Sequence, residues 1–165
     1  MKERYKKPDC IKELERLALE AKRKKYPDVP FLAPIIFEDK TANGLTRAII
    51  AYIKLRGFQA ERVNNYGRPV DNRKTYVNTI GMQRTIGNIE WVKGTGTDGS
   101  SDIHATIKPK NSKFGVSVKI EVKIGRDFQS LKQKQYQIEI EKAGGIYFLA
   151  KNFTSFFNWY NENFQ

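Results

Sequence analysis

The nine residues VSVKIEVKI at positions 116–124 alternate strictly between apolar and polar side chains. In a β-strand successive side chains point to opposite faces of the sheet, so one face of this stretch is entirely aliphatic. The other face carries Ser117, Lys119, Glu121 and Lys123. The stretch therefore predicts a strand that packs on a hydrophobic core with one face and presents ionisable groups on the other.

The segments on either side extend this strand into a sheet. A strand is predicted at 102–107, and a turn at 108–115 leads from it into the alternating stretch. A helix is predicted at 128–143, closed by Gly144-Gly145, and an apolar strand at 146–150 follows it. The order strand, helix, strand suggests one parallel crossover.

The remaining elements set the fold class and the domain organisation. Helices are predicted at 9–25, at 42–56 and from Asn152 onward, and short strands at 58–63, 75–77 and 89–92. This order predicts an α/β (α+β) fold with a mixed central sheet flanked by helices. We expect an N-terminal helix and proline-containing connector at 1–40, and a core at 41–165 with a basic insertion at about 64–98.

The charge of the chain points to a polyanionic partner. Its 165 residues include 30 Lys and Arg against 18 Asp and Glu, a formal net charge of +12. Nucleic acid is the first candidate partner and an anionic membrane surface the second. There is one cysteine, Cys10, and we find neither a signal peptide nor an apolar stretch that could span a bilayer, so we expect a cytoplasmic protein without a membrane segment.

Three residues could form a site for phosphodiester chemistry. Glu121 and Lys123 leave the same face of their strand, and Asp102 lies at the start of the preceding one. If these strands are neighbours, the two carboxylates converge within reach of one cation such as Mg²⁺, which prefers oxygen ligands. Alternating Glu and Lys on a solvated strand face is the competing interpretation.

A basic stretch with interleaved aromatic residues predicts contact with DNA. Tyr66, Tyr76 and Trp91 lie among its cations, and such rings can stack on bases while arginines bind phosphates. The alternative is a solvated loop whose aromatic rings are tucked into the core. With Lys119 from the central strand, the residues predicted to bind nucleic acid are Arg62, Arg68, Arg73, Lys74, Arg84, Lys93 and Lys119.

Four segments together carry a resemblance to a known family: GSSDI at 99–103, VKIEVK at 118–123, QSLKQ at 129–133 and AGG at 143–145. The chain resembles the PD-(D/E)XK nuclease superfamily, and within it the VRR-NUC and Holliday-junction-resolvase-like branch of phages and mobile elements. The resemblance covers roughly residues 42–160. It implies that Asp102 and Glu121 bind Mg²⁺ or Mn²⁺, that Lys123 is the catalytic lysine, and that Gln133 is the helix glutamine that supports the site.

The chain departs from this family pattern at two places. Ser101 stands where a proline usually precedes the aspartate, and the first core helix has no glutamate, which puts a second metal site in doubt. Glu38 or Asp39 could replace that carboxylate from the preceding loop. His104, the only histidine, follows Asp102 on the same strand face and is either a neighbour of the site or a surface side chain.

The resulting expectation is a metal-dependent DNA endonuclease, directed by DNA structure, that acts in replication, recombination or repair. The alternatives are a catalytically inactive nucleic-acid-binding protein on a degenerate nuclease fold and a sequence-specific restriction-type endonuclease. Resolution of four-way junctions would additionally require a homodimer, because two strands must be cut symmetrically.

Overall fold

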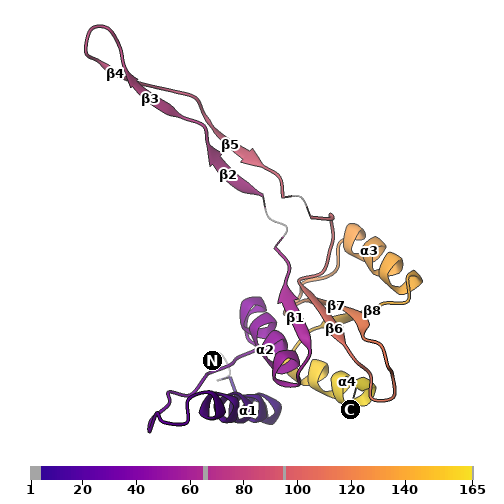
Figure 1. The fold of residues 1–165 in the computed structure, drawn as a ribbon. Coiled ribbons are helices and arrows are strands. Elements are labelled where there is room, and N and C mark those ends of the chain that lie inside the picture. Colours follow the sequence, from indigo (N-terminus) through magenta and orange to yellow (C-terminus); the bar gives the residue numbers. More distant parts are fainter. Residues whose placement is uncertain (1–4, 65–66, 95, 165) are drawn as a thin grey trace. The chain divides into compact units, whose positions relative to one another are not determined.

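The computed structural model describes residues 5–64, 67–94 and 96–164, and Figure 1 shows its ribbon. The chain forms two units. The first contains the residues up to Val63 together with those from Gly99 onward, and the second is the segment 64–98. All the residues predicted to be catalytic belong to the first unit.

The first unit is built on a mixed sheet with the strand order β1-β6-β7-β8. The four strands are β1 (Gln59–Arg62), β6 (Ile103–Ile107), β7 (Val116–Val122) and β8 (Ile146–Ala150). The strands β1, β6 and β7 are antiparallel to one another, whereas β8 runs parallel to β7 after the connecting helix α3 (Leu131–Lys142). This arrangement confirms the predicted parallel crossover and the mixed α and β architecture.

Three helices share one hydrophobic core with the sheet: α1 (Asp9–Lys25), α2 (Ala42–Leu55) and α4 (Phe153–Phe164). They confirm the helices predicted at these places. The largest fully buried side chains are Tyr52, Tyr160, Phe153, Phe156, Ile11, Leu14, Leu45, Ile49, Ile53, Ile103, Ile107 and Ile120. Among the described residues, no helix is both long enough and apolar enough to cross a membrane.

Aromatic side chains form the centre of this core. The ring centroid of Tyr52 lies between 5.2 and 6.1 Å from those of Phe153, Phe156 and Tyr160, in edge-to-face arrangements that aromatic pairs favour. Their spacing on α4 is helical, so they all leave one face of that helix. The helix α4 is thereby fixed against α2, on the side of the sheet that carries Val118, Ile120 and Val122.

The helix α3 lies over the other face of the sheet and contributes no buried residue of its own. It begins at Leu131 and not at residue 128 as predicted, because Ser130 caps it. The hydroxyl of Ser130 accepts a hydrogen bond from the backbone N–H of Gln133, and the side chain of Gln133 accepts one from the backbone N–H of Ser130. This reciprocal capping box satisfies two amide groups that a helix start would otherwise leave unpaired.

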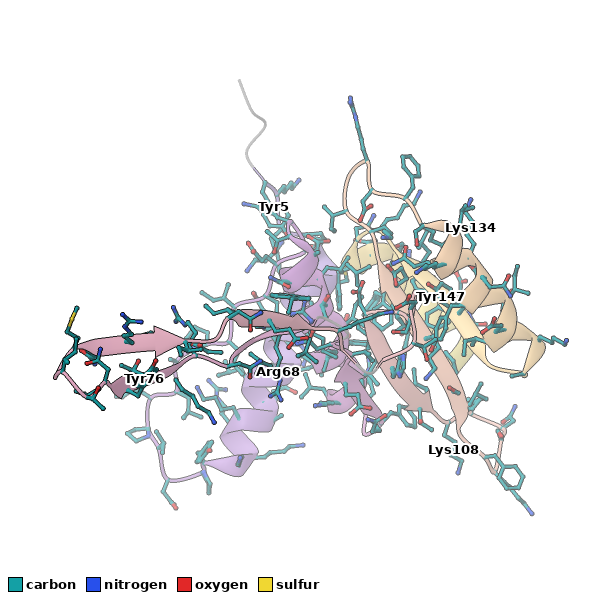
Figure 2. All side chains as sticks on the ribbon, turned by 90° about the horizontal axis from the view of Figure 1, so that it is seen from above. Tyr5, Arg68, Tyr76, Lys108, Lys134 and Tyr147 are labelled. Atoms are coloured by element: carbon teal, nitrogen blue, oxygen red, sulfur yellow. The ribbon has the colours of Figure 1, made fainter. Side chains whose placement is uncertain are left out.

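The second unit is a narrow antiparallel ribbon. It pairs β2 (Arg68–Asp71) with β5 (Ile89–Val92), and β3 (Lys74–Val77) with β4 (Gln83–Ile86). The strands expected at 75–77 and 89–92 are confirmed, but their partners β2 and β4 were not predicted. The side chains along the ribbon, including Arg68 and Tyr76, are drawn in Figure 2. Every residue of β3, β4 and β5 is exposed, so the described residues of this unit form no core.

We expect Phe156→Ala to lower the free energy of unfolding by about 3–5 kcal/mol, because it opens a cavity in a core that cannot collapse around it. Phe156 is fully buried and its ring contacts those of Tyr52, Phe153 and Tyr160. Phe114→Ala is the matched control, since Phe114 is 80% exposed, and should change stability by less than about 0.5 kcal/mol. Urea denaturation followed by circular dichroism measures both, and equal losses would contradict this account of the core.

Candidate active site

The candidate site lies where β6 begins and β7 ends. Ile103 pairs with Ile120 across these strands, which places Asp102 opposite Glu121. The backbone carbonyl of Asp102 accepts a hydrogen bond of 2.8 Å from the N–H of Val63, and its Oδ2 atom accepts one of 2.9 Å from the N–H of Val122. These two hydrogen bonds hold Asp102 between the strands on either side of it. The sequence predicted that the carboxylates of Asp102 and Glu121 would converge if their strands were neighbours, and the strands are neighbours.

Glu121 is the most deeply buried ionisable group of the site, with only 2% of its surface exposed. Its Oε1 atom accepts a hydrogen bond of 2.5 Å from Gln133 Nε2 and lies 3.2 Å from Lys123 Nζ. Its Oε2 atom is also buried but has no hydrogen-bond partner. At Glu121 and Lys123 the polar face of the alternating stretch is therefore buried and not solvated, whereas Ser117 on the same face is exposed.

The surroundings of Glu121 change its acidity. Burial and the neighbouring Asp102 carboxylate raise its pKa from 4.5 to about 7, although Lys123 acts in the opposite direction. Lys123 lies beside the Oε1 atom of Glu121, whereas the Oε2 atom of the same carboxylate has no partner. A bound cation would supply one.

Gln133 connects the site to the start of α3. Both ends of its amide are used, since the oxygen accepts from the backbone of Ser130 while the nitrogen donates to Glu121. The loop before Asp102 approaches the same turn of the helix. Gly99 has φ +80, and a Cβ atom there would lie 2.5 Å from the carbonyl carbon of Lys132. Only glycine suits this position, because the conformation and the space both exclude a side chain.

Lys123 is 8% exposed and lies between two carboxylates. Its Nζ atom is 3.2 Å from Glu121 and 3.3 Å from Asp127. Burial lowers the pKa of Lys123, but hydrogen bonds and charge attraction to Glu121 and Asp127 outweigh it, and the pKa is raised overall. The raised pKa favours the positively charged form of Lys123 at neutral pH.

The donor set fits an oxygen-seeking divalent cation. Asp102 and Glu121 supply carboxylate oxygens, and the orphaned Oε2 atom of Glu121 is the atom that such an ion would satisfy. Among the residues that the structure describes, no group of three or more His, Cys, Asp or Glu side chains is placed to hold a metal. Two carboxylates suit Mg²⁺, which retains several water ligands and seldom uses a cage made only of protein groups.

A second row of polar side chains lies beside the site on the same face of the sheet. His104 pairs with Lys119 on β7 and with Glu61 on β1, and its Nε2 atom lies 3.3 Å from the hydroxyl of Tyr136 on α3. Burial, followed by the charge of Lys119, lowers the pKa of His104. His104 is thus a neighbour of the site that is held to α3, and its lowered pKa favours the neutral imidazole.

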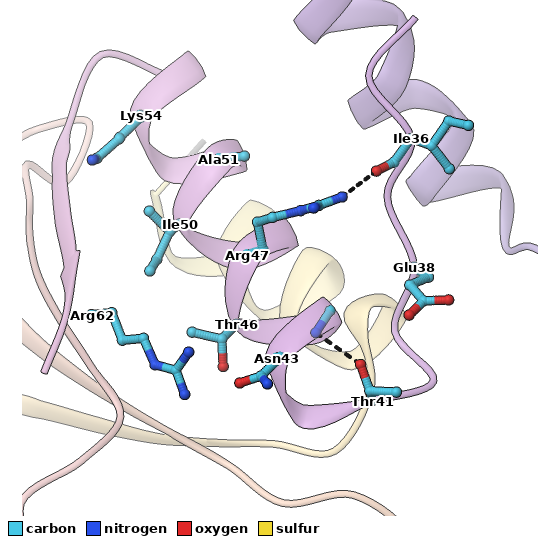
Figure 3. A pocket seen from close by; sticks show the side chains of 11 residues that line it. Ile36, Glu38, Thr41, Asn43, Thr46, Arg47, Ile50, Ala51, Lys54 and Arg62 are labelled. Carbon is cyan, nitrogen blue, oxygen red and sulfur yellow. Dashed lines mark hydrogen bonds between the residues drawn. The ribbon is translucent and has the colours of Figure 1, made fainter. Parts of the chain in front are cut away.

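The other residues predicted to bind nucleic acid fall in different places. Arg62 leaves β1 on the side of α2, where it lines a pocket of about 780 Å³ together with Asn43, Thr46 and Lys54 (Figure 3). Lys119 is on the face of the candidate site. The remaining five, Arg68, Arg73, Lys74, Arg84 and Lys93, belong to the ribbon. Within the ribbon Arg73 forms an ion pair with Asp71, and Lys93 one with Asp98.

Asp39 and Glu38, the two residues that could have replaced the missing helix carboxylate, make their contacts elsewhere and not with Asp102 or Glu121. Asp39 accepts hydrogen bonds from the backbone N–H of Phe153 and the hydroxyl of Tyr5, so it supports the start of α4. Glu38 lines the pocket beside α2.

Two residues that lie near the site, Asp127 and Tyr147, were not predicted from the sequence. Asp127 forms an ion pair with Lys123 from the turn after β7, and the spacing of four residues between them was a usable signal. Tyr147 leaves β8 on the face of α3, and its hydroxyl is buried without a hydrogen-bond partner. Burial and the charge of Glu121 raise the pKa of Tyr147. A tyrosine within the apolar run of β8 was the only indication, and such residues are common in cores.

We expect the metal-free protein to lose stability as the pH rises through the folded-state pKa of Glu121. That pKa is about 7 against an ordinary value of 4.5, so between these values the folded state holds a proton that the unfolded chain has released. The contribution is complete below the ordinary value and is lost above the raised one, with a total of at most about 3 kcal/mol.

Urea denaturation in EDTA across this pH range measures the effect. Glu121→Gln should remove the pH-dependent contribution, whereas Glu162→Gln, which changes an exposed glutamate on α4, should retain it. An unaltered slope in the Glu121 variant would show that burial does not perturb this carboxylate.

Gln133→Ala should be more destabilising than Ser130→Ala at about pH 8. Each substitution removes one side-chain bond of the capping box, which is worth about 1 kcal/mol. Only the loss of Gln133 also takes a donor from the buried Glu121 carboxylate, which adds about 1–3 kcal/mol. Thermal and urea denaturation of the two variants provide the comparison, and equal losses would mean that the bond to Glu121 contributes nothing.

No protein-family model, no curated protein and no solved structure matches this chain. The function proposed below therefore rests on the surroundings of Asp102, Glu121, Lys123 and Gln133, and on the charge of the chain.

Proposed function

We propose that this protein is a Mg²⁺- or Mn²⁺-dependent endodeoxyribonuclease with a restriction-endonuclease-like core. The observation that carries the proposal is the buried Glu121 carboxylate, which has one oxygen held by Gln133 and Lys123 and the other without a partner. The element order α2, β1, β6, β7, α3, β8 supports the core, because it places Asp102, Glu121 and Lys123 on one face under one helix.

The residues of the site have separable roles. Asp102 and Glu121 would hold the cation, which when bound polarises a phosphate and lowers the pKa of a water molecule. Gln133 fixes the orientation of the Glu121 carboxylate, and its own orientation is fixed by the capping box. Lys123 keeps a positive charge at neutral pH and offsets the negative charge that develops on the phosphate in the transition state.

The choice of DNA as the proposed substrate rests on the charge of the chain. The net charge of +12 favours a polyanionic substrate. No motif for reading base sequence is evident, so the substrate is proposed to be selected by DNA structure. Cleavage confined to one short palindrome would instead identify a restriction-type enzyme.

A second candidate is a DNA-binding protein that has lost activity. One observation favours it: the sequence of α2, ANGLTRAIIAYIKL, contains no acidic residue that could complete the carboxylate set. Under this alternative the site binds no cation, so direct metal binding separates the two candidates independently of any activity assay.

We expect the wild-type protein to bind Mn²⁺ and to cut DNA in its presence. Binding can be followed by the loss of the free-ion signal in electron paramagnetic resonance. Cleavage can be followed with labelled single-stranded, duplex, flap and four-way-junction DNA. Asp102→Asn with Glu121→Gln should abolish binding, and Glu121→Gln or Lys123→Ala should each lower the cleavage rate by about 100-fold or more.

Matched controls separate these effects from a general loss of charge. Glu162→Gln and Lys113→Ala remove the same charges from exposed positions outside the site, and should retain both activities. DNA binding without metal binding or cutting would move the protein to the second candidate. Cutting that survives in both Glu121→Gln and Lys123→Ala would exclude this site as the active centre.

A further inference from the structure

The tip of the ribbon is a loop with a defined conformation. Residues 78–82 connect β3 to β4, and the backbone N–H of Asn78 donates to the carbonyl of Met82 at 2.9 Å. The side-chain oxygen of Asn78 accepts hydrogen bonds from the backbone N–H groups of Ile80 and Met82, at 3.2 and 2.8 Å. Gly81 supplies the positive φ that closes the turn. The loop is thus held by its own backbone and by Asn78, without help from its apolar side chains.

Those apolar side chains project into solvent. Ile80 is 74% exposed and Met82 is 56% exposed. Neither belongs to the hydrophobic core cluster of the described residues. Apolar surface at the tip of the ribbon gains nothing from the folding of the ribbon itself, so a bound partner is where it would be buried.

The charged residues on the strands next to the tip indicate the chemical class of the partner. From Asn72 to Ile89 the chain contains Arg73, Lys74 and Arg84 but no acidic residue. Tyr76 lies opposite Arg84 and Lys74 opposite Ile86, so by strand alternation these two cations share one face of the outer ribbon. Thr75 and Thr85 face the other way, and their hydroxyls are hydrogen-bonded at 3.0 Å. Cations that flank an apolar tip are complementary to a polyanion with a hydrophobic interior, which describes duplex DNA.

We propose that the ribbon lies along a groove of duplex DNA and inserts Ile80 and Met82 between neighbouring base pairs, so that one base step is unstacked. A two-stranded ribbon has a width that a DNA groove admits, and exposed Ile and Met are side chains that act as wedges between bases. Lys74 and Arg84 contact phosphates beside the wedge. The inference rests on the proposed function for the choice of DNA, and it extends that function by giving the ribbon the task of distorting the substrate.

The test uses the full chain and duplex DNA that carries 2-aminopurine, whose fluorescence rises when it is unstacked. All measurements are made in EDTA, so that no cleavage can occur, with the probe placed at successive positions. The wild type should increase the fluorescence at a defined position, and Ile80→Ser with Met82→Ser should lose most of that increase at saturating protein. The loop should persist in this variant, because Asn78 bonds only to backbone groups there.

Two controls sharpen the comparison. Val77→Thr changes a side chain that is 66% exposed at the end of β3, just before the tip, and should keep the full fluorescence increase. Arg84→Ala should weaken binding and reduce its salt dependence, but should leave the increase unchanged at saturation.

The outcomes distinguish this inference from the proposed nuclease activity. Unstacking by a wild type that fails to cut with Mn²⁺ would support the ribbon while the nuclease proposal fails. Cutting by a wild type that unstacks no position, or a double serine variant that unstacks as the wild type does, would overturn the ribbon's role. Loss of a concentration-dependent dimer in the double variant, measured by sedimentation with no change in fluorescence, would assign the tip to a second copy of the chain and overturn it as well.

Discussion

Glu121 imposes the constraint on which the first unit depends, because a carboxylate that is 2% exposed must be compensated where it lies. Gln133 and Lys123 contact one of its oxygens, and the contact with Gln133 requires the crossover that carries the chain from β7 through α3 to β8. The same glutamine closes the capping box of α3. The start of the helix and the orientation of the carboxylate are therefore fixed together, and a change in either would disturb the other.

The two faces of the sheet are stabilised by different forces. The face toward α1, α2 and α4 is apolar and closely packed, and it supplies the hydrophobic stabilisation of the unit. The face toward α3 has no buried residue from that helix and is joined to it by polar contacts from Gln133 and Tyr136. Such a network holds buried charges in a single arrangement only when its members are satisfied. Among the described residues, the Oε2 atom of Glu121 and the hydroxyl of Tyr147 are buried without a hydrogen-bond partner, and the Oε2 atom is the reason to propose a cation there.

The ribbon follows a different principle, since its strands are held by backbone hydrogen bonds and cross-strand pairs without a core. Its strands β2 and β4 were not predicted, because they are short, Pro69 lies in one of them, and polar residues dominate the other. Pairing with β5 and β3 decides their structure, and a partner strand is not visible in the local sequence. The interpretation of aromatic rings tucked into a core does not hold for Tyr76 and Trp91, which are 44% and 67% exposed, whereas Tyr66 lies outside the described residues.

The sequence by itself determined the elements whose signal is local. Alternation at 116–124 indicated β7 and its apolar face, helical spacing indicated four helices, and residue types and order singled out Asp102, Glu121, Lys123 and Gln133. Only the tertiary structure decided that α3 covers the polar face, that Asp102 lies opposite Glu121, and that Asp127 and Tyr147 join them. The physical reason is that backbone geometry sets side-chain periodicity within a few residues. Burial, and with it the raised pKa of Glu121, depends on segments that are distant in the chain.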